Sequence, residues 1–261
     1  MLDRTDPATA EALARLYDLD LEDDPGDLDL YLALADRADG PIVELAAGSG
    51  RLAVPLAAAG HRVTAIDNDR AMLARARQRA TAAGVPDGRL ELVEADLLDL
   101  PPAIDQGHAL AFIALNSIML MGTRDAQRAA VRSLAAQLRP GGLAVVDAWL
   151  PDADDLARFD GRLILEWIRT DEDGASVTKT GSAVHDAATG TMVLTAIFEA
   201  ASPGGPARRW IRQDRLRLIG ADELVGFAEE AGLRVELVAG GYDLSPIGPG
   251  SERAVLVAER R

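Results

Sequence analysis

The sequence of 261 residues contains no cysteine and only three histidines. The absence of cysteine excludes disulfide bonds, thiolate nucleophiles and cysteine-ligated metal sites. The histidines, His61, His108 and His185, are not spaced with carboxylates in the way that metal ligands are, so we expect no metal site. His185 precedes Asp186, but adjacent residues of a strand point to opposite faces, which argues against a catalytic pair.

Long apolar runs and positive charge are also scarce. No run is long enough to cross a bilayer, and the N-terminus carries Asp3, Arg4 and Asp6 instead of an apolar signal core. We therefore expect a cytoplasmic protein without a membrane partner. The 27 basic residues against 42 acidic ones give a net charge of −15, which repels polyanions and argues against nucleic acid as a partner. A neutral or cationic small molecule is the better fit.

One stretch, PIVELAAGSGRL at residues 41–52, predicts a strand, a tight turn and a helix. Open α/β folds bind nucleotides at such a turn. Gly48 and Gly50 allow a positive φ and let a ligand approach the main chain closely. Glu44, at the end of the apolar run, can only accept hydrogen bonds when ionised, so its expected partner is a cation or a hydroxyl group.

Two further predicted strands end in acidic residues. Asp67 follows the apolar residues 63–66, about twenty residues beyond the glycines, where this kind of fold binds a ribose. Asp96 follows a third apolar segment at residues 90–93. Because the carboxyl ends of parallel strands lie at one edge of a sheet, we expect Glu44, Asp67 and Asp96 to outline one crevice.

With these motifs the chain resembles the class I S-adenosylmethionine-dependent methyltransferases. Residues 44–50 match the acidic-x-Gly-x-Gly-x-Gly signature of that family, except that Ala46 replaces the first glycine. If this position needs a positive φ, the alanine costs about 1 kcal/mol or more. The resemblance implies that the cofactor is S-adenosyl-L-methionine.

The resemblance also implies roles for individual residues. Glu44 and the loop around Ala46, Gly48 and Gly50 would hold the methionine end of the cofactor, and Asp67 would hold the ribose hydroxyls. Asn68 and Met72 would lie against the adenine, Asp96 would accept from its amino group, and Leu97 would pack on its ring. Asn116, after the fourth strand, would lie near the transferred methyl group, and Tyr17 would be a lid residue near the methyl donor. No catalytic acid or base is indicated, so Tyr17 and Asn116 are positioning candidates only.

The predicted fold is α/β, with a doubly wound, mostly parallel seven-stranded sheet (Rossmann-like) and an inserted antiparallel β-sheet. Residues 1–40 read as an N-terminal helical cap with helices at 8–17 and 28–38. Residues 41–149 and 219–261 show the alternation of strands and helices that is typical of a parallel sheet covered on both faces. Residues 150–218 contain strand patterns at 162–170, 175–185, 191–200 and 208–218, which we expect to form an acceptor lid or a dimer contact.

Candidates for acceptor binding are aromatic and charged residues that we expect near the entrance of the crevice. They are Trp149, Glu166, Trp167, Arg209, Trp210 and Tyr242. Packing alone would also explain aromatic residues in such a sheet. Glu166 is of interest because a carboxylate beside tryptophans suits a cationic amine.

The sequence favours methyl transfer to a nitrogen of a small molecule. A neutral amine needs only to lose a proton, whereas a hydroxyl acceptor usually needs a general base, and no histidine is placed for that role. The alternatives are an O-methyltransferase and a non-catalytic nucleotide-binding or regulatory protein of the same fold. A nicotinamide oxidoreductase would require the spacing Gly-x-Gly-x-x-Gly, which residues 48–53 lack. We also expect a homodimer as one assembly of the chain.

Overall fold

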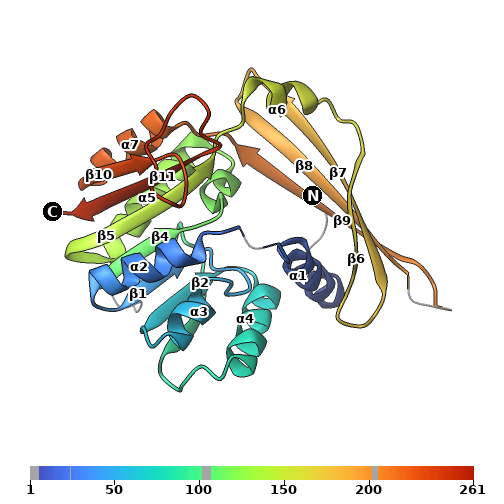
Figure 1. The fold of residues 1–261 in the computed structure, drawn as a ribbon, viewed down its shortest axis with the longest axis horizontal. Coiled ribbons are helices and arrows are strands. Elements are labelled where there is room, and N and C mark those ends of the chain that lie inside the picture. The colour runs from blue at the N-terminus through green and yellow to red at the C-terminus, as the bar shows by residue number, and fades with distance from the viewer. Residues whose placement is uncertain (1–5, 24, 102–106, 202–204) are drawn as a thin grey trace. The chain divides into compact units, whose positions relative to one another are not determined.

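A computed structural model describes residues 6–23, 25–101, 107–201 and 205–261 (Figure 1). The chain divides into two compact units. Residues 25–150 and 219–261 form the first, called the main unit below. Residues 1–24 and 151–218 form the second, called the insertion unit. None of the helices within the described ranges is long and apolar enough to pass through a membrane.

The main unit is built on a seven-stranded sheet with the strand order β10-β11-β5-β4-β1-β2-β3. The strands are β1 (Ile42–Leu45), β2 (Val63–Asp67), β3 (Leu90–Glu94), β4 (His108–Ile113), β5 (Leu138–Trp149), β10 (Leu233–Ala239) and β11 (Arg253–Arg260). Neighbouring strands are parallel except that β11 is antiparallel to both β5 and β10. The predicted doubly wound, mostly parallel sheet is therefore confirmed, and β1 to β4 place their carboxyl ends along one edge.

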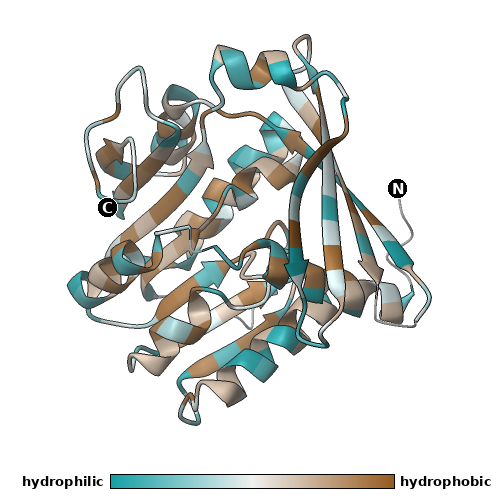
Figure 2. Cartoon of the chain, turned by 45° about the vertical axis from the view of Figure 1, so that its right-hand side comes forward, coloured by the Kyte–Doolittle hydropathy of each residue, from teal (hydrophilic) through white to brown (hydrophobic). Residues whose placement is uncertain are grey.

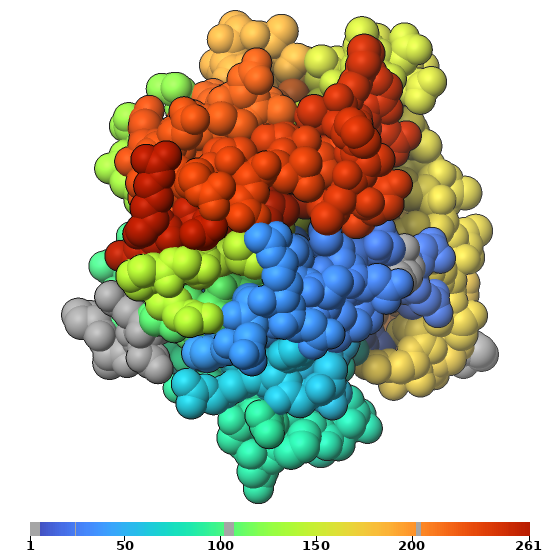
Figure 3. Space-filling model, turned by 60° about the vertical axis from the view of Figure 1, so that its left-hand side comes forward, coloured from blue at the N-terminus to red at the C-terminus, as the bar shows by residue number. Residues whose placement is uncertain are grey.

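Helices cover both faces of this sheet (Figure 1). They are α2 (Leu28–Ala38), α3 (Ala53–Ala58), α4 (Arg70–Ala82), α5 (Arg124–Gln137) and α7 (Ala221–Glu230), and a short 3₁₀ helix, η1 (Ser117–Met121), follows β4. Side-chain caps set two of the starts, because Asp69 accepts from the backbone N–H groups of Ala71 and Met72 and Thr123 accepts from that of Ala126. The surface of α2 borders the C-terminal segment (Figure 3), where Arg37 of α2 pairs with Glu236 of β10 at 2.6 Å.

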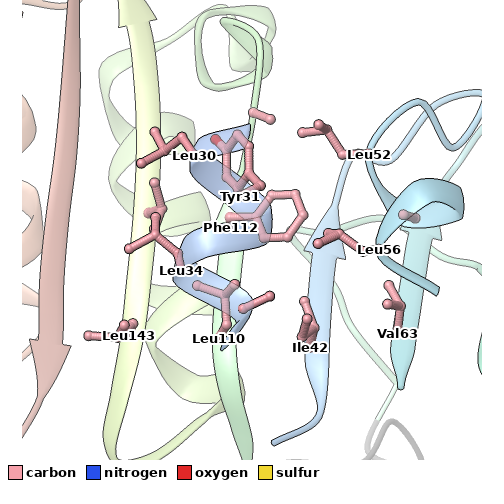
Figure 4. Close-up of a cluster of buried hydrophobic side chains, with 14 of the residues drawn as sticks. Leu30, Tyr31, Leu34, Ile42, Leu52, Leu56, Val63, Leu110, Phe112 and Leu143 are labelled. Atoms are coloured by element: carbon pink, nitrogen blue, oxygen red, sulfur yellow. The ribbon is translucent and has the colours of Figure 1, made fainter. Parts of the chain in front are cut away.

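The core between α2, α3 and the sheet is formed by large apolar side chains that are almost fully buried (Figure 4). At its centre the rings of Tyr31 and Phe112 lie 4.5 Å apart, a distance at which aromatic rings attract one another. The strands of the main sheet are coloured as hydrophobic over most of their length in Figure 2. Such near-continuous apolar strands are expected where a parallel sheet is covered on both faces, and this core fixes the edge at which the acidic residues lie.

The insertion unit consists of a four-stranded antiparallel sheet, with the order β6-β7-β8-β9, and two helices. Its elements are α1 (Pro7–Asp20), α6 (Ala153–Arg158), β6 (Ile164–Thr170), β7 (Ser176–Asp186), β8 (Thr191–Ala201) and β9 (Arg208–Arg217). Leu16 of α1 packs with Val177 and Phe198 on one face of this sheet. The predicted inserted antiparallel sheet is thus confirmed, and α1 and α2 from the expected N-terminal cap belong to different units. Residues 1–5 of that cap lie outside the described residues.

The structure differs from the expected elements in three places. Helix α6 was not expected, although Asp152 and Asp155 form a capping box at its start. The 3₁₀ helix η1 was also missed, because its five residues are too short for a helical period to show. From the sequence, residues 140–142 are expected to stop the preceding helix and the apolar residues 143–147 to form a strand. The structure instead begins β5 at Leu138, and Pro140, Gly141 and Gly142 lie within it at a register shift against β4.

Candidate cofactor site

Glu44 is a buried carboxylate in β1 with an unused hydrogen-bonding atom. Glu44 is 4% exposed, and the Oε2 atom of its side chain has no hydrogen-bond partner within the described structure. Burial raises the pKa of Glu44 to about 8, although the nearby guanidinium of Arg51 acts in the opposite direction. A buried acceptor without a donor is unfavourable, so this position fits a ligand that brings an N–H donor or a positive charge.

The loop after β1 has the left-handed conformation that the glycine signature predicts. The φ values of Ala46, Gly48 and Gly50 are 59°, 56° and 73°. A Cβ atom on Gly50 would lie 3.0 Å from side-chain carbons of both Val54 and Ala76, so this glycine is also required for packing. The substitution of alanine at position 46 therefore leaves the loop shape intact but places a side chain in a conformation that favours glycine.

Asp67 connects the end of β2 to the glycine loop. One carboxylate oxygen accepts from the N–H of Gly48 at 2.7 Å and the other accepts from the N–H of Asp69 at 2.8 Å. Asn68 is exposed and Met72 is partly exposed in the first turn of α4. The structure thus brings Asp67 and the glycine loop together, as expected for a carboxylate beside a nucleotide-binding turn.

Asp96 follows β3, the strand beside β2. The backbone N–H of Ala95 donates to the carbonyl oxygen of Asp67 at 3.1 Å. The Asp96 carboxylate is exposed and accepts from the N–H of Leu98 at 2.9 Å. Leu97 is only 6% exposed, whereas Leu98 is 42% exposed. Of these two leucines, Leu97 is therefore largely covered by the protein itself.

A buried ion pair beside this loop was not predicted from the sequence. Arg51, the first residue after the glycine loop, donates to both oxygens of Asp27 at 2.6 and 2.7 Å, and Asp27 is fully buried. Asp27 follows an acidic segment broken by Pro25 and Gly26, which reads as an exposed connection. The only available signal was the arginine next to the glycine loop, and it does not identify the partner.

Asn116 lies at the carboxyl end of β4, the strand beside β1. Leu115 and Asn116 both have a positive φ, at 50° and 63°. The Oδ1 atom of Asn116 is buried and, like Glu44 Oε2, has no hydrogen-bond partner within the described structure. Near the carboxyl ends of the neighbouring strands β1 and β4 there is therefore in each case a buried acceptor atom without a hydrogen-bond donor among the described residues, Glu44 Oε2 and Asn116 Oδ1.

The acceptor candidates of the main unit lie near the end of β5. Trp149 is the last residue of that strand and is opposite Arg253 in the register with β11. The hydroxyl group of Tyr242 donates to Asp147 at 3.0 Å, and the guanidinium of Arg253 lies 4.2 Å from the centre of its ring. Burial raises the pKa of Tyr242 well above its usual range, so its hydroxyl stays neutral.

The remaining candidates belong to the insertion unit, where they contact one another or α1. The guanidinium of Arg212 lies 5.4 Å from the ring centre of Tyr17. Trp167 donates its indole N–H to Asp20 at 2.9 Å and its ring lies 6.1 Å from that of Phe198. Two further candidates on β9, Arg209 and Trp210, lie beside α1 in one surface pocket.

Glu166 does not present an unpaired charge. Its Oε2 atom lies 2.7 Å from Nζ of Lys179, which also contacts both carboxylate oxygens of Asp20 at 2.7 Å. A cationic acceptor would have to compete with Lys179 for this carboxylate. The role of Glu166 in acceptor recognition stays a prediction.

Part of the main unit matches a known family of proteins. Residues 42–142 match the family model described as "Methyltransferase domain", and they include β1, the glycine loop, Asp67, Asp96 and Asn116. This match and the similar proteins described below indicate a class I S-adenosylmethionine-dependent methyltransferase. Its cofactor is therefore S-adenosyl-L-methionine. The orphaned acceptor on Glu44 and the glycine loop joined to Asp67 fit this cofactor, which carries an ammonium group, ribose hydroxyls and a positively charged sulfonium.

Several relatives of this methyltransferase are similar over most of their length. The cypemycin N-terminal methyltransferase of a Streptomyces species is 27% identical over 226 residues, which are 84% of this chain and 83% of that protein. The CcbJ methyltransferase from Streptomyces caelestis is 25% identical, with a TM-score of 0.75 over 91% of this chain and 96% of that one. A sugar N-methyltransferase from a Streptoalloteichus species shares the fold, at 20% identity and a TM-score of 0.74 over 94% of this chain and 92% of that one.

Proposed function

We propose that this methyltransferase transfers the methyl group to a nitrogen atom of a small-molecule acceptor. The observation that carries the proposal is the relative that methylates the N-terminus of cypemycin, because it aligns with 84% of this chain. The sugar N-methyltransferase of the same fold gives further support. Both names point to an amine as the methyl acceptor.

We further propose how the main unit holds the cofactor. Glu44 Oε2 accepts from the ammonium group, and the backbone of residues 46–50 lies along the methionine end. Asp67 accepts from the ribose hydroxyls, and Asp96 accepts from the adenine amino group. Asn68, Met72 and Leu97 pack against the adenine. This arrangement uses the buried acceptor of Glu44 and the carboxyl ends of the adjacent parallel strands β2 and β3.

The chemistry requires alignment more than a catalytic base. The cofactor supplies an electrophilic methyl group on a sulfonium. With the cofactor bound, the acceptor nitrogen would use its lone pair to form the bond to the methyl carbon, and the electrons of the broken carbon–sulfur bond would remain on sulfur. The nitrogen would then release a proton to solvent. The protein contributes by holding the reacting atoms in line and by excluding water.

The positions of the histidines favour nitrogen over oxygen as the acceptor atom. His108, in the first position of β4, is 2% exposed, with its Nδ1 atom 3.2 Å from the carbonyl oxygen of Gln137. His61 precedes β2 and lies 3.4 Å from Asp36. Both precede or begin strands, whereas Glu44 and Asp67 lie at the opposite, carboxyl ends. An amine acceptor does not need the base that a hydroxyl acceptor usually requires.

A screen of acceptors tests the nitrogen proposal. The purified chain is incubated with S-adenosylmethionine and pairs of small molecules that differ only in an amine or a hydroxyl at one position, and products are detected by mass spectrometry. We expect the amine of a pair to gain a methyl group and the hydroxyl compound to remain unchanged. Turnover of hydroxyl compounds alone would establish an O-methyltransferase, and cofactor binding without turnover of any acceptor would favour the non-catalytic alternative.

We also propose that Trp149, Glu166, Trp167 and Tyr242 contribute to acceptor binding, with residues 150–218 as an acceptor lid. We propose Tyr17 and Asn116 as positioning residues at the cofactor site, near the methyl donor. Once an acceptor is known, Glu166→Gln separates the two roles of this carboxylate. If Glu166 recognises a cationic acceptor, the variant raises KM and leaves kcat nearly unchanged. If Glu166 serves only Lys179, the variant lowers stability and leaves KM unchanged.

A homodimer is the assembly that we propose. Leu165, Thr180, Ile197 and Ile211 are directly opposite one another in the register of β6 to β9, so they share one face of the insertion sheet. Trp167, Lys179, Phe198 and Trp210 form the next row on the opposite face, which packs on α1. Leu165 is 57% exposed and Ile211 is 37% exposed. An exposed apolar face on a sheet is suited to contact a second copy.

A further inference from the structure

Besides Glu44 and Asp27, the main unit buries the carboxylate of Asp147 in β5, which accepts hydrogen bonds from four donors. Asp147 is fully buried. Its Oδ1 atom accepts from the N–H of Leu115 at 2.7 Å and from the hydroxyl of Tyr31 at 3.3 Å. Its Oδ2 atom accepts from the hydroxyl of Tyr242 at 3.0 Å and from Nη1 of Arg253 at 2.9 Å. Each oxygen therefore has two donors, and a charge-assisted network of this kind is strong.

Leu115 links this network to the edge that binds the cofactor. Leu115 and the following residue, Asn116, both have the left-handed conformation that side chains rarely adopt. The shortest of the four hydrogen bonds to Asp147 comes from the N–H of Leu115, at the start of this strained pair. The next side chain, Asn116, has a buried Oδ1 atom without a hydrogen-bond partner in the described structure. The turn at Leu115 and Asn116 therefore combines backbone strain with an unsatisfied acceptor, and its N–H at Leu115 is bound by Asp147.

The negative charge of Asp147 is needed for this arrangement. Arg253 Nη1 contacts both Asp147 and the hydroxyl of Tyr242, the latter at 2.7 Å, and its guanidinium stacks on the Tyr242 ring. An asparagine at position 147 would keep one oxygen that accepts hydrogen bonds. Its NH₂ group would replace the other oxygen and, being a donor itself, could not accept from the two donors on that side. It would also leave Arg253 without its countercharge. The shape would be conserved, but two of the four hydrogen bonds would be lost.

We propose that Asp147 is a positioning residue that holds the Leu115–Asn116 turn so that Asn116 presents its side-chain oxygen to the bound cofactor. The inference rests on the proposed placement of Asn116 at the cofactor site. Asp147 is 32 positions from Leu115, 95 from Tyr242 and 106 from Arg253, so the network exists only in the folded sheet. It acts through Asn116 and touches no reacting atom itself.

A double-mutant cycle in cofactor affinity tests the proposal without an acceptor. Isothermal titration with S-adenosylhomocysteine is performed on the wild type, Asp147→Asn, Asn116→Ala and the double variant. We expect each single variant to weaken binding about tenfold and the double variant to be no weaker than the worse single variant, because Asp147 acts through Asn116. Independent effects that multiply to about a hundredfold would overturn the proposal.

Asp171→Asn is the matched control. Asp171 is also a nearly buried aspartate with several donors, Arg15 at 2.8 Å and the N–H groups of Asp173 and Ala175 at 3.0 and 2.9 Å, but it belongs to the insertion unit. We expect this variant to lower Tm and leave the affinity for S-adenosylhomocysteine unchanged. An equal loss of affinity in Asp171→Asn would show that instability alone explains the effect of Asp147→Asn, and would overturn the proposal.

The outcomes separate this inference from the proposed cofactor site. If the wild type does not bind S-adenosylhomocysteine, the cofactor site fails. If the wild type binds and Asn116→Ala does not change affinity, the positioning role fails while the site stands. Should Asp147→Asn not fold, Tyr242→Phe takes its place in the cycle, because it removes one donor to Asp147 and keeps all charges.

Hydrogen exchange of the Leu115 amide measures the hydrogen bond to Asp147 directly. We expect at least about tenfold faster exchange in the Asp147 or Tyr242 variant, and an unchanged rate would overturn the proposal.

Discussion

Ala46 occupies a backbone position that suits glycine better. Its φ of 59° is in the left-handed region, and relief of this strain is worth about 1 kcal/mol. We expect Ala46→Gly to raise the free energy of unfolding by about that amount, less the entropy that the unfolded chain gains. Chemical denaturation measures the change. Ala47→Gly is the control, because Ala47 is buried without a positive φ, and it should destabilise the protein.

Equal destabilisation by both glycine substitutions would contradict the loop geometry. It would mean that Ala46 is not held at a positive φ in solution.

Glu44 makes stability depend on pH because burial raises its pKa from 4.5 to about 8. Between these values the folded chain binds more protons at this site than the unfolded chain does, so stability falls as pH rises. The contribution is complete below about pH 4.5 and is lost as the pH passes through about 8. Glutamine does not titrate, so Glu44→Gln should not lose stability in this way. We expect the free energy of unfolding of the variant, relative to that of the wild type, to increase from pH 5 to pH 8 by on the order of 3 kcal/mol.

Thermal or chemical unfolding of both proteins across this pH range measures the difference. A constant difference between wild type and Glu44→Gln would contradict the buried, protonated state of Glu44. Addition of S-adenosylmethionine should reduce the pH effect, because an ammonium donor favours the charged carboxylate.

At the scale of single elements, the N-cap of α5 stabilises the helix that follows the Leu115–Asn116 turn and η1. Thr123 accepts from the N–H of Ala126 at 3.2 Å. We expect Thr123→Ala to lower the free energy of unfolding by about 1 kcal/mol, because the first turn loses its side-chain acceptor. The matched control is Thr81→Ala near the end of α4, where the hydroxyl of Thr81 donates to the carbonyl oxygen of Arg77 and caps nothing.

The control should change stability by less than about 0.5 kcal/mol. Similar losses in the two alanine variants, measured by denaturant titration, would show that the Thr123 hydroxyl has no capping role.

Elements with a clear period could be predicted from the sequence, and contacts between distant residues could not. The alternation of apolar segments and helical patterns predicts the seven-stranded sheet, because burial on both faces requires apolar strands. Helix α6 and η1 were missed because each is too short to show a period. The glycine loop and Asp67 were predicted as neighbours because parallel strands align their carboxyl ends, and the hydrogen bond from Gly48 to Asp67 confirms their proximity.

The buried partners of the site were beyond sequence reasoning. Asp27 reads as part of an acidic connection, and Asp147 reads as the end of a strand. Their roles depend on Arg51, Tyr242 and Arg253, which are brought near only by the fold. Burial of a charge is decided by such partners and not by local pattern.

At the scale of the whole molecule, the proposed homodimer depends on the exposed face of the insertion sheet. We expect Leu165→Asp to convert a dimer to a monomer, because it places a charge on the apolar row that includes Ile197 and Ile211. Light scattering after size exclusion measures the mass. Leu163→Asp is the control on the same surface region outside the named strands, where the leucine is 63% exposed.

A wild type that is monomeric at all concentrations would contradict the dimer. An unchanged dimer in Leu165→Asp would place the contact elsewhere on the molecule.

The most direct test of the account is an isothermal titration of the wild type and Asp67→Ala with S-adenosylmethionine, S-adenosylhomocysteine and NAD. We predict that the wild type binds the two sulfur nucleosides and not NAD, and that Asp67→Ala weakens both by about tenfold or more, because the ribose hydroxyls lose their acceptor. Asp87→Ala, an exposed aspartate between α4 and β3, should bind as the wild type does. Binding of NAD alone, or equal affinity in Asp67→Ala and wild type, would contradict the assignment of this crevice as the cofactor site.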